Sequence, residues 1–201
     1  MGRTTRRLFL GSAAGILAIP AIVRPARAAD ITWRLGHTAP IDFPLHQRLL
    51  AAAEEIGTKS NGRLEIQIVP DSQLGSQIGL LSQVRNGSLE MSALTGQILA
   101  TAQALAGLPM TGFGFSGYDK LWPAMDGELG KTIREQMQLR VGITLLSRIW
   151  DFGFRVISTA DKPIKSPNDL NGLRIRTPVE AEFVNLFRAL QANPIAMSLN
   201  E

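Results

Sequence analysis

Apolar and polar positions alternate along this chain with two periods, one typical of strands and one typical of helices. A first strand is predicted over Ile31–Gly36, and apolar side chains then recur at helical spacing from Pro44 to the Asn61-Gly62 turn. Over residues 64–68 every second residue is apolar, which is the period of a half-buried strand, and Pro70 ends it. The opening of the chain therefore predicts a strand, a helix and a second strand.

The middle of the chain continues this alternation and then departs from it. The pattern predicts a helix over Gln77–Asn86 that Gly87 closes, a strand over Leu89–Leu94, and a weaker helix over Gln97–Leu105. The run LPMTGFGFSG, residues 108–117, has too many glycines for a helix and too many large apolar residues for a solvated loop. Such a segment usually lines something, so we expect this run to be a lining segment.

The last third again mixes helices and strands. A helix that carries Leu129, Ile133 and Met137 is predicted to end before Gly142. The segments predicted after it are, in order, strands over Ile143–Ile149 and Phe152–Ser158, a helical turn capped by Ser166 or Asp169, a strand over Leu173–Thr177 and a helix that begins at Pro178. Strands that alternate with helices predict an open α/β sheet, in which ligands collect at the carboxyl ends of the strands.

Composition and charge narrow the function classes. The 201 residues are 45% apolar and 19% charged, which fits a soluble globular protein. The net charge of +4 comes from five arginines in the first 28 residues, and the remainder carries 16 basic residues against 17 acidic ones. No basic footprint for nucleic acid is left. The absence of cysteine excludes disulfides, thiolate zinc sites and cysteine nucleophiles.

Residues 1–28 are predicted to be a cleaved export signal. Arg6-Arg7 precede Leu8-Phe9-Leu10 as in a twin-arginine signal, and the following apolar stretch is shorter than the roughly 20 residues that a membrane-spanning helix needs. Ala26 and Ala28 supply the small side chains of a signal-peptidase site. The alternative is an uncleaved anchor helix. The signal places the mature chain, which would begin near Ala29, in the periplasm.

The residues that could support catalysis are few. No Gly-x-Ser-x-Gly elbow, His-Glu-x-x-His motif, phosphate loop or dinucleotide fingerprint occurs. Two histidines, His37 and His46, do not make a zinc site without cysteine or clustered carboxylates. We therefore expect no metal, no cofactor and no enzyme activity. His37 follows the first strand, where a structural hydrogen bond is favoured over contact with a ligand.

Arginines at strand ends are more informative. Arg176 lies at the carboxyl end of the predicted strand 173–177, and Arg155 lies between apolar neighbours. A guanidinium in such a place matches a carboxylate in a bidentate way, although the partner could be an Asp or Glu of the protein itself. The aromatic residues that could wall a site for a small organic molecule, or simply pack in the core, are Trp150, Phe154, Phe113 and Phe115.

A series of short motifs resembles the solute-binding proteins of tripartite ATP-independent periplasmic (TRAP) transporters, the DctP-like family. These motifs occur in the family's order along nearly all of the mature chain: Gly36-His37, Asn61 through Ile66, Pro70 through Gly75, Asn86 through Met91, Leu108-Pro109 through Phe115, Gly153-Phe154-Arg155, Lys162-Pro163 and Pro167 through Pro178. Each motif alone is weak, and their shared order makes the resemblance specific.

The resemblance implies a function. Members of the family have two α/β lobes that close on hinge strands over an organic acid, which is then delivered to TRAP membrane subunits in the inner membrane. Arg176 matches the arginine that clamps the carboxylate, and Arg155 matches a second frequent contact. The predicted ligand-binding residues are thus Arg176, Arg155, Trp150, Phe115 and His37. The acid itself stays open, since aromatic, branched, dicarboxylic, keto and sugar acids all suit an arginine clamp.

The domain boundaries follow from the same resemblance. After the export signal, residues 29–153 are expected to form most of the first lobe with the hinge crossing, and residues 154–201 part of a second lobe that is incomplete relative to the family.

Two alternative functions stay open. One is a receptor that serves an ATP-driven importer or a sensor kinase, and the other is a secreted enzyme that uses Ser, Asp or His37.

Overall fold

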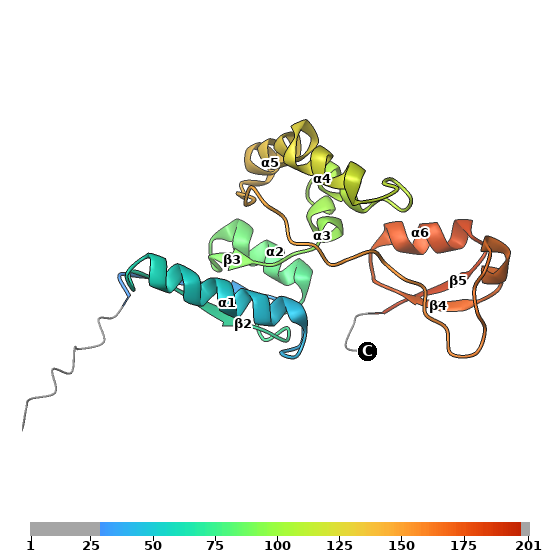
Figure 1. Ribbon diagram of the computed structural model, residues 1–201, viewed down its shortest axis with the longest axis horizontal. Coiled ribbons are helices and arrows are strands. Elements are labelled where there is room, and N and C mark those ends of the chain that lie inside the picture. Colours follow the sequence, from blue (N-terminus) through green and yellow to red (C-terminus); the bar gives the residue numbers. More distant parts are fainter. Residues whose placement is uncertain (1–28, 198–201) are drawn as a thin grey trace, which may run out of the picture.

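The computed structural model describes residues 29–197, so the predicted export signal lies outside the described part. A parallel sheet opens the fold, with β1 (Ile31–Gly36) between β2 (Leu64–Val69) and β3 (Met91–Ser92). The helix α1 (Pro44–Lys59) links β1 to β2, and α2 (Gln77–Asn86) links β2 to β3. Figure 1 shows α1 lying along β2. The predicted strand, helix and strand are therefore confirmed.

The sheet and α2 approach each other closely at one residue of β1. A Cβ atom placed on Gly36 would lie 2.8 Å from Cδ2 of Leu80 and 3.3 Å from Cδ2 of Leu89. Both leucines are almost completely buried, so they have little room to move. A larger residue at this crossing would force these leucine side chains to move within a packed core.

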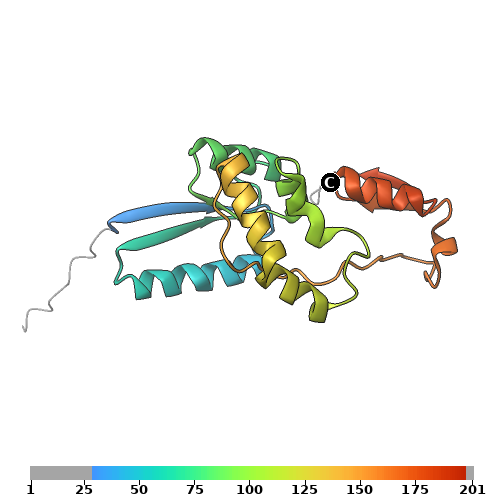
Figure 2. The same cartoon turned by 90° about the horizontal axis from the view of Figure 1, so that it is seen from above.

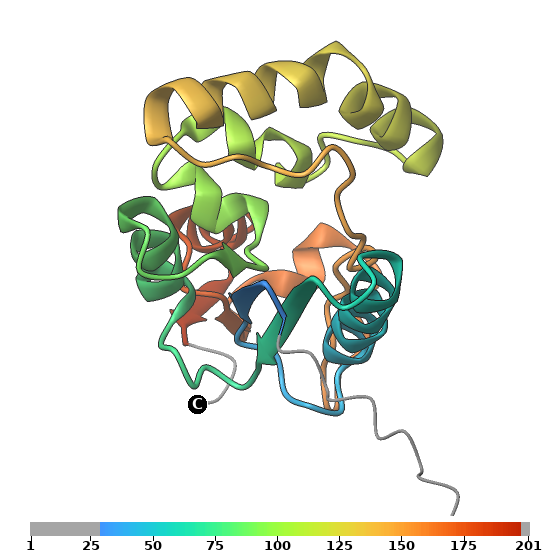
Figure 3. The same ribbon diagram turned by 90° about the vertical axis from the view of Figure 1, so that its left-hand side faces the viewer.

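A helical layer packs against α2 and contains most of the apolar core. It consists of α3 (Gly96–Ala100), the 3-10 helix η1 (Ala104–Met110), α4 (Tyr118–Asp126) and α5 (Glu128–Val141). Figure 3 shows α4 and α5 on the side of α3 that is away from the sheet. The buried side chains of this core are Leu81, Ile98, Ala106, Met125, Ile133, Met137, Val141 and Ile143. Within residues 29–197 no helix has both the length and the apolar character to cross a membrane.

A smaller unit follows in the chain and lies at the other end of the molecule from α1 (Figure 2). After the 3-10 turn η2 (Pro167–Leu170), β4 (Arg174–Thr177) pairs in parallel with β5 (Asn193–Ala196), and α6 (Ala181–Ala189) connects them. This strand, helix and strand form the second α/β unit.

Several predicted helix ends are confirmed. Gly87 after α2 and Gly142 after α5 have φ values of 76° and 77°, the left-handed conformation that glycine adopts without strain. At η2 the carboxylate of Asp169 accepts hydrogen bonds from the backbone N–H and the hydroxyl of Ser166, at 2.9 and 3.0 Å. Together with a hydrogen bond from the backbone N–H of Lys165, which is the largest cause, these bonds lower the pKa of Asp169.

Two predicted strands are wrong. Residues 143–149 and 152–158 belong to an extended connection, residues 142–166, that forms no β-ladder with any residue between 29 and 197. Leu146 is 67% exposed and Val156 is 85% exposed, so these side chains find no sheet to pack against. A period-2 pattern needs a neighbouring strand to become a strand, because pairing satisfies the backbone and covers the apolar face.

Two other predictions were too long. The strand expected over Leu89–Leu94 is limited to the two residues of β3, because β1 pairs with it only at Leu35 and Gly36. The helix expected over Gln97–Leu105 is divided into α3 and η1. The side chains of Thr95 and Gln103 accept hydrogen bonds from backbone N–H groups at the starts of these two helices, so each begins separately.

Candidate functional site

Arg176 lies on the exposed face of β4, one residue before the strand ends. Its Nη2 donates a hydrogen bond of 2.7 Å to the backbone carbonyl of Met197, and the backbone N–H of Met197 in turn donates to the carbonyl of Thr177 at 3.0 Å. No Asp or Glu of residues 29–197 lies within ion-pair distance of this guanidinium. A neutral carbonyl holds the side chain and leaves its charge uncompensated.

Arg174 shares the exposed face of β4 with Arg176 but lies at the start of the strand. The two arginines have the same charge and similar exposure, and they differ in their position along the strand. Arg174 is therefore a natural internal control for Arg176.

Arg155 lies in the extended connection and contacts the second unit through an aromatic ring. Its Cζ lies 4.6 Å from the centroid of the Phe183 ring, which is within the range of a cation–π interaction. Phe183 belongs to α6 and is 7% exposed. Among the residues that the structure describes, no carboxylate pairs with Arg155. Among the described residues, therefore, no Asp or Glu neutralises Arg155 or Arg176, which was the alternative that the sequence left open.

Trp150 lies beside α1, which belongs to the first unit, the sheet of β1 to β3 together with the helices α1 to α5. It lines an open hollow of about 510 Å³ together with residues of α1, and neither Arg155 nor Arg176 borders this hollow. The residues that line it with Trp150 are Arg48, Ala51, Ala52, Glu55, Ile149 and Asp151. The structure thus places Trp150 in a hollow beside α1 that neither of the two predicted anchor arginines lines.

Phe154 packs against α4 rather than into a cavity. Its ring centroid is 4.6 Å from that of Tyr118, and Tyr118 in turn stacks on Trp122 at 5.5 Å. The hydroxyl of Tyr118 donates a hydrogen bond of 2.6 Å to Oδ2 of Asp151, and this bond raises the pKa of Tyr118. Tyr118 and Trp122 were not singled out from the sequence, because the pattern alone gives no partner for an aromatic residue on a helix.

The glycine-rich run 108–117 contacts α6. A Cβ atom on Gly112 would lie 2.8 Å from Cδ2 of Leu186, so the backbone of this run approaches the helix closely. Within the run Phe115 is half-buried, whereas Phe113 is 88% exposed. The run therefore forms part of the contact between the two units, as its composition predicted for a lining segment.

His37 is buried directly after β1, with 1% of its surface exposed. Its Nε2 lies 3.1 Å from Nδ1 of His46, which α1 supplies. Burial lowers the pKa of His37, the nearby His46 lowers it further, and Asp71 acts in the opposite direction. In this arrangement His37 links β1 to α1, and the structure gives it little surface with which to touch a ligand.

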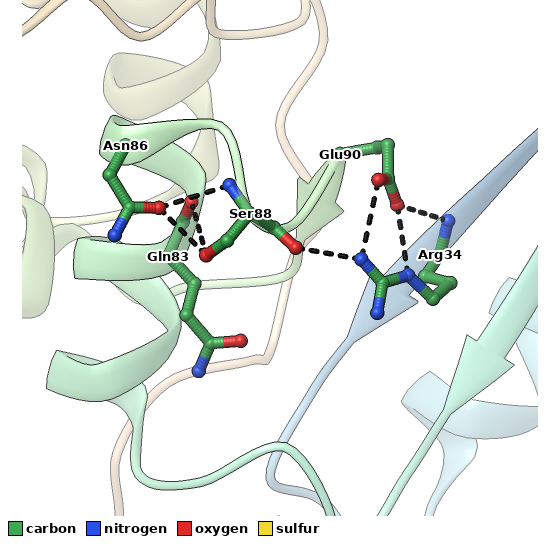
Figure 4. Close-up of polar contacts among 5 residues, drawn as sticks. All are labelled: Arg34, Gln83, Asn86, Ser88 and Glu90. Carbon is green, nitrogen blue, oxygen red and sulfur yellow. Dashed lines mark hydrogen bonds and ion pairs between the residues drawn. The ribbon is translucent and has the colours of Figure 1, made fainter.

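Arg34 shows how a satisfied arginine looks in the same protein (Figure 4). Its Nε and backbone N–H both donate to Oε2 of Glu90, at 3.3 and 2.8 Å, and its Nη2 donates to the carbonyl of Ser88 at 2.7 Å. These bonds tie β1 to the turn before β3 and lower the pKa of Glu90. Neither Arg155 nor Arg176 has such a partner among residues 29–197.

The sequence model of the bacterial extracellular solute-binding proteins, family 7, matches residues 35–201 of this chain. The chain belongs to that family. The match covers the same stretch as the ordered motifs from Gly36-His37 to Pro178, so the resemblance to the TRAP solute-binding proteins is confirmed.

Named relatives and solved structures agree with this assignment. The chain is 30% identical over 203 residues to the C4-dicarboxylate-binding periplasmic protein DctP of Rhodobacter capsulatus, a match that covers 98% of this chain and 59% of that protein. A TRAP periplasmic solute-binding protein of Sulfurospirillum deleyianum with bound succinate superposes with a TM-score of 0.77 at 25% identity, over 86% of this chain and 55% of that one. A second, from Haemophilus influenzae with bound L-gulonate, has a TM-score of 0.75 at 28% identity, over 85% and 55%.

The chain matches only part of each relative's length, so the fold comparison applies to that part. The chain spans between 35% and 60% of the curated relatives and about 55% of the two solved chains. The α/β fold of a periplasmic solute-binding protein is confirmed, with a second lobe that is incomplete relative to those structures. The relatives that carry a functional name are solute-binding proteins, among them the solute-binding protein RD1_1052 of Roseobacter denitrificans and DctP of Rhodobacter capsulatus. No group of three metal-ligating side chains occurs in the described part of the chain.

Proposed function

We propose that this protein is an extracytoplasmic receptor that binds a small organic carboxylate and delivers it to the membrane subunits of a TRAP transporter. Arg176 is its chief anchor and Arg155 its second contact. Residues 29–153 contribute most of the first lobe and residues 154–201 part of the second. Residues 1–28 direct export through the twin-arginine pathway.

The observation that carries the proposal is the state of Arg176. Its guanidinium is exposed near the end of a parallel strand, a carbonyl holds one nitrogen, and no acidic residue of the described chain pairs with it. Ligands of open α/β sheets collect at such strand ends. The planar guanidinium fork has further N–H donors, and a carboxylate accepts two of them in parallel. An anionic ligand supplies the partner that residues 29–197 lack.

The comparisons favour a particular set of acids as probes. Relatives of this chain hold succinate and L-gulonate, which both carry a carboxylate at the end of a short carbon chain. Trp150 and Phe115 are proposed to contribute apolar surface when the lobes close, and His37 to support the strand end next to the site. The common requirement is the carboxylate, so this group defines the ligand class.

A thermal-shift screen tests the proposal. The purified protein is heated with succinate, L-gulonate and a panel of keto, branched and aromatic acids, each beside its uncharged amide or methyl ester. A ligand at 100 times its dissociation constant adds about 2.7 kcal/mol to the folded state, which is a clear rise in Tm. A rise with the acids and none with the amides or esters supports the proposal. Equal shifts for an acid and its amide, or no shift with any acid, contradict it.

A further inference from the structure

We infer that Phe183 is a positioning residue for Arg155, and that its ring holds the guanidinium on α6 for a carboxylate ligand. The inference rests on the proposed function for its ligand and on the observed side-chain geometry for its contact. Nothing in the motifs that led to Arg155 and Arg176 pointed to Phe183, which lies in the helix predicted to begin at Pro178.

The geometry isolates the ring as the partner of Arg155. The guanidinium carbon is 4.6 Å from the ring centroid, and within residues 29–197 Arg155 has no other side-chain partner, neither a hydrogen bond nor an ion pair. A long side chain on an otherwise exposed segment loses rotamer freedom only if something holds it. The aromatic face is the group that provides this restraint.

An aromatic partner differs from an acidic one in what it leaves available. A carboxylate such as Glu90 takes up the N–H donors of its arginine and cancels the charge, as seen at Arg34. A ring attracts the cation through its quadrupole and brings no negative charge. Arg155 is thereby fixed in place while its charge stays unpaired, which is the state that suits the capture of an anion.

The position of Phe183 in the fold connects the two arginines. The helix α6 follows β4 directly in the chain, so the unit that presents Arg176 also supplies the ring beneath Arg155. The preceding residue, Phe154, packs on Tyr118 of α4 instead. The chain thus changes its packing partner from the first unit to the second between residues 154 and 155, and Phe183 fixes Arg155 on the second.

The test compares Phe183→Leu, which keeps an apolar side chain but removes the ring, with Phe183→Tyr, which keeps the ring. Calorimetric titrations use the acid with the largest thermal shift, with succinate as the default. Phe183→Leu is expected to weaken binding about 2- to 30-fold, the range of a cation–π contact. Phe183→Tyr is expected to stay within about twofold of the parent protein.

Two further measurements separate positioning from a general loss of structure. In an Arg155→Ala background, adding Phe183→Leu should change affinity by less than about twofold, because the group that Phe183 holds is gone. In NMR spectra of the ligand-free parent protein, the ring current of Phe183 should shift the Cδ protons of Arg155 upfield, and this shift should be absent in Phe183→Leu and kept in Phe183→Tyr.

The outcomes distinguish this inference from the proposed function. If the parent protein binds an acid and Phe183→Leu binds it equally well, the role of Phe183 is refuted while the proposed function stands. The same conclusion follows if Phe183→Leu weakens binding as much in the Arg155→Ala background as in the parent protein. The absence of a ring-current shift in the parent protein overturns that role as well, even if Phe183→Leu does not fold. If no acid binds the parent protein, the proposed function fails and the ligand role of Phe183 fails with it, while the NMR shift still reports whether the contact exists.

Discussion

Arg34 and Arg176 lie on the two sheets of the same molecule in opposite chemical states. Arg34, on β1, is paired with Glu90 and donates to the carbonyl of Ser88, and it connects β1 to the turn before β3 (Figure 4). Arg176, on β4, has only the carbonyl of Met197 as a side-chain partner among residues 29–197. The first arginine contributes to the structure of its unit, whereas the second keeps a charge that the described chain does not neutralise.

The units that carry Arg34 and Arg176 also differ in how tightly they are packed. The first unit has a continuous apolar core and a glycine that packs without free space against Leu80. The second has two short strands and one helix, and its exposed strand face carries Arg174 and Arg176. Stability is thus concentrated around β1, while unpaired charge is concentrated around β4. Substitutions in each unit, and a change of pH, can test this division.

Removal of Arg176 should abolish most of the ligand affinity. Losing one partner of a buried charge pair costs roughly 2 to 5 kcal/mol, which corresponds to about 30-fold to several thousand-fold in affinity. Arg174→Ala, the matched control on the same face, should change affinity by less than about threefold, because its charge lies at the other end of the strand. Calorimetric titration with the bound acid measures both. Equal affinities for the parent protein and Arg176→Ala would refute the proposed anchor.

Gly36→Ala should destabilise the protein without involving the ligand site. The added methyl would lie 2.8 Å from Leu80, which is fully buried, and overpacking of this kind costs roughly 1 to 3 kcal/mol. Gly57→Ala is the control, since its nearest neighbour is 4.0 Å away and alanine favours the helix by about 1 kcal/mol. Urea unfolding measures both free energies. A Gly36→Ala protein as stable as the parent would show that this crossing is not closely packed.

Acid should weaken the first unit through His37. Its pKa lies below the ordinary value of 6.5, so the unfolded chain binds the proton more readily than the folded one. The resulting stability is complete above pH 6.5 and is lost as the pH falls through the lowered pKa of the folded state. Tm should therefore fall as the pH is lowered from about 8 to about 5, a range that contains the ordinary pKa of histidine. His37→Gln should show a flatter curve, and an equally steep one would assign the effect to other groups.

Arg34→Met should have the smallest effect on stability and none on the ligand. The ion pair is exposed, and such pairs contribute little because water and salt screen them. We expect Tm to fall by about 3 °C or less, and the fall to shrink in 1 M salt, where the Debye length is about 3 Å. Differential scanning calorimetry at low and high salt measures this change. A loss of acid affinity in Arg34→Met would contradict the division between the two arginines.

Local chemistry was predictable at many points of the fold. The alternation at residues 64–68, the glycines after α2 and α5, and the Ser166–Asp169 cap each depend on interactions within a few residues. The sequence predicts such interactions directly, because they depend on the backbone conformation of each residue and on hydrogen bonds to its neighbours in the chain. For the same reason, the pattern of residues was sufficient to place Arg176 near the carboxyl end of a strand.

What depends on partners distant in the chain could not be predicted. The apolar pattern over 143–149 and 152–158 is that of strands, yet only a neighbouring strand could make it one, and none pairs with it within residues 29–197. Trp150 and Arg155 are close in sequence, yet one lies beside α1 and the other on Phe183 of α6.

Local propensities and short motifs in the amino-acid sequence specify the class of this chain and the order of most of its elements. They also single out Arg155 and Arg176 as candidate ligand contacts. Packing in three dimensions is what sets which arginine is neutralised, which is held by a carbonyl and which rests on a ring. Those states depend on groups that come together from separate elements, and a charge is satisfied or left unpaired only by what lies within a few ångströms of it in space.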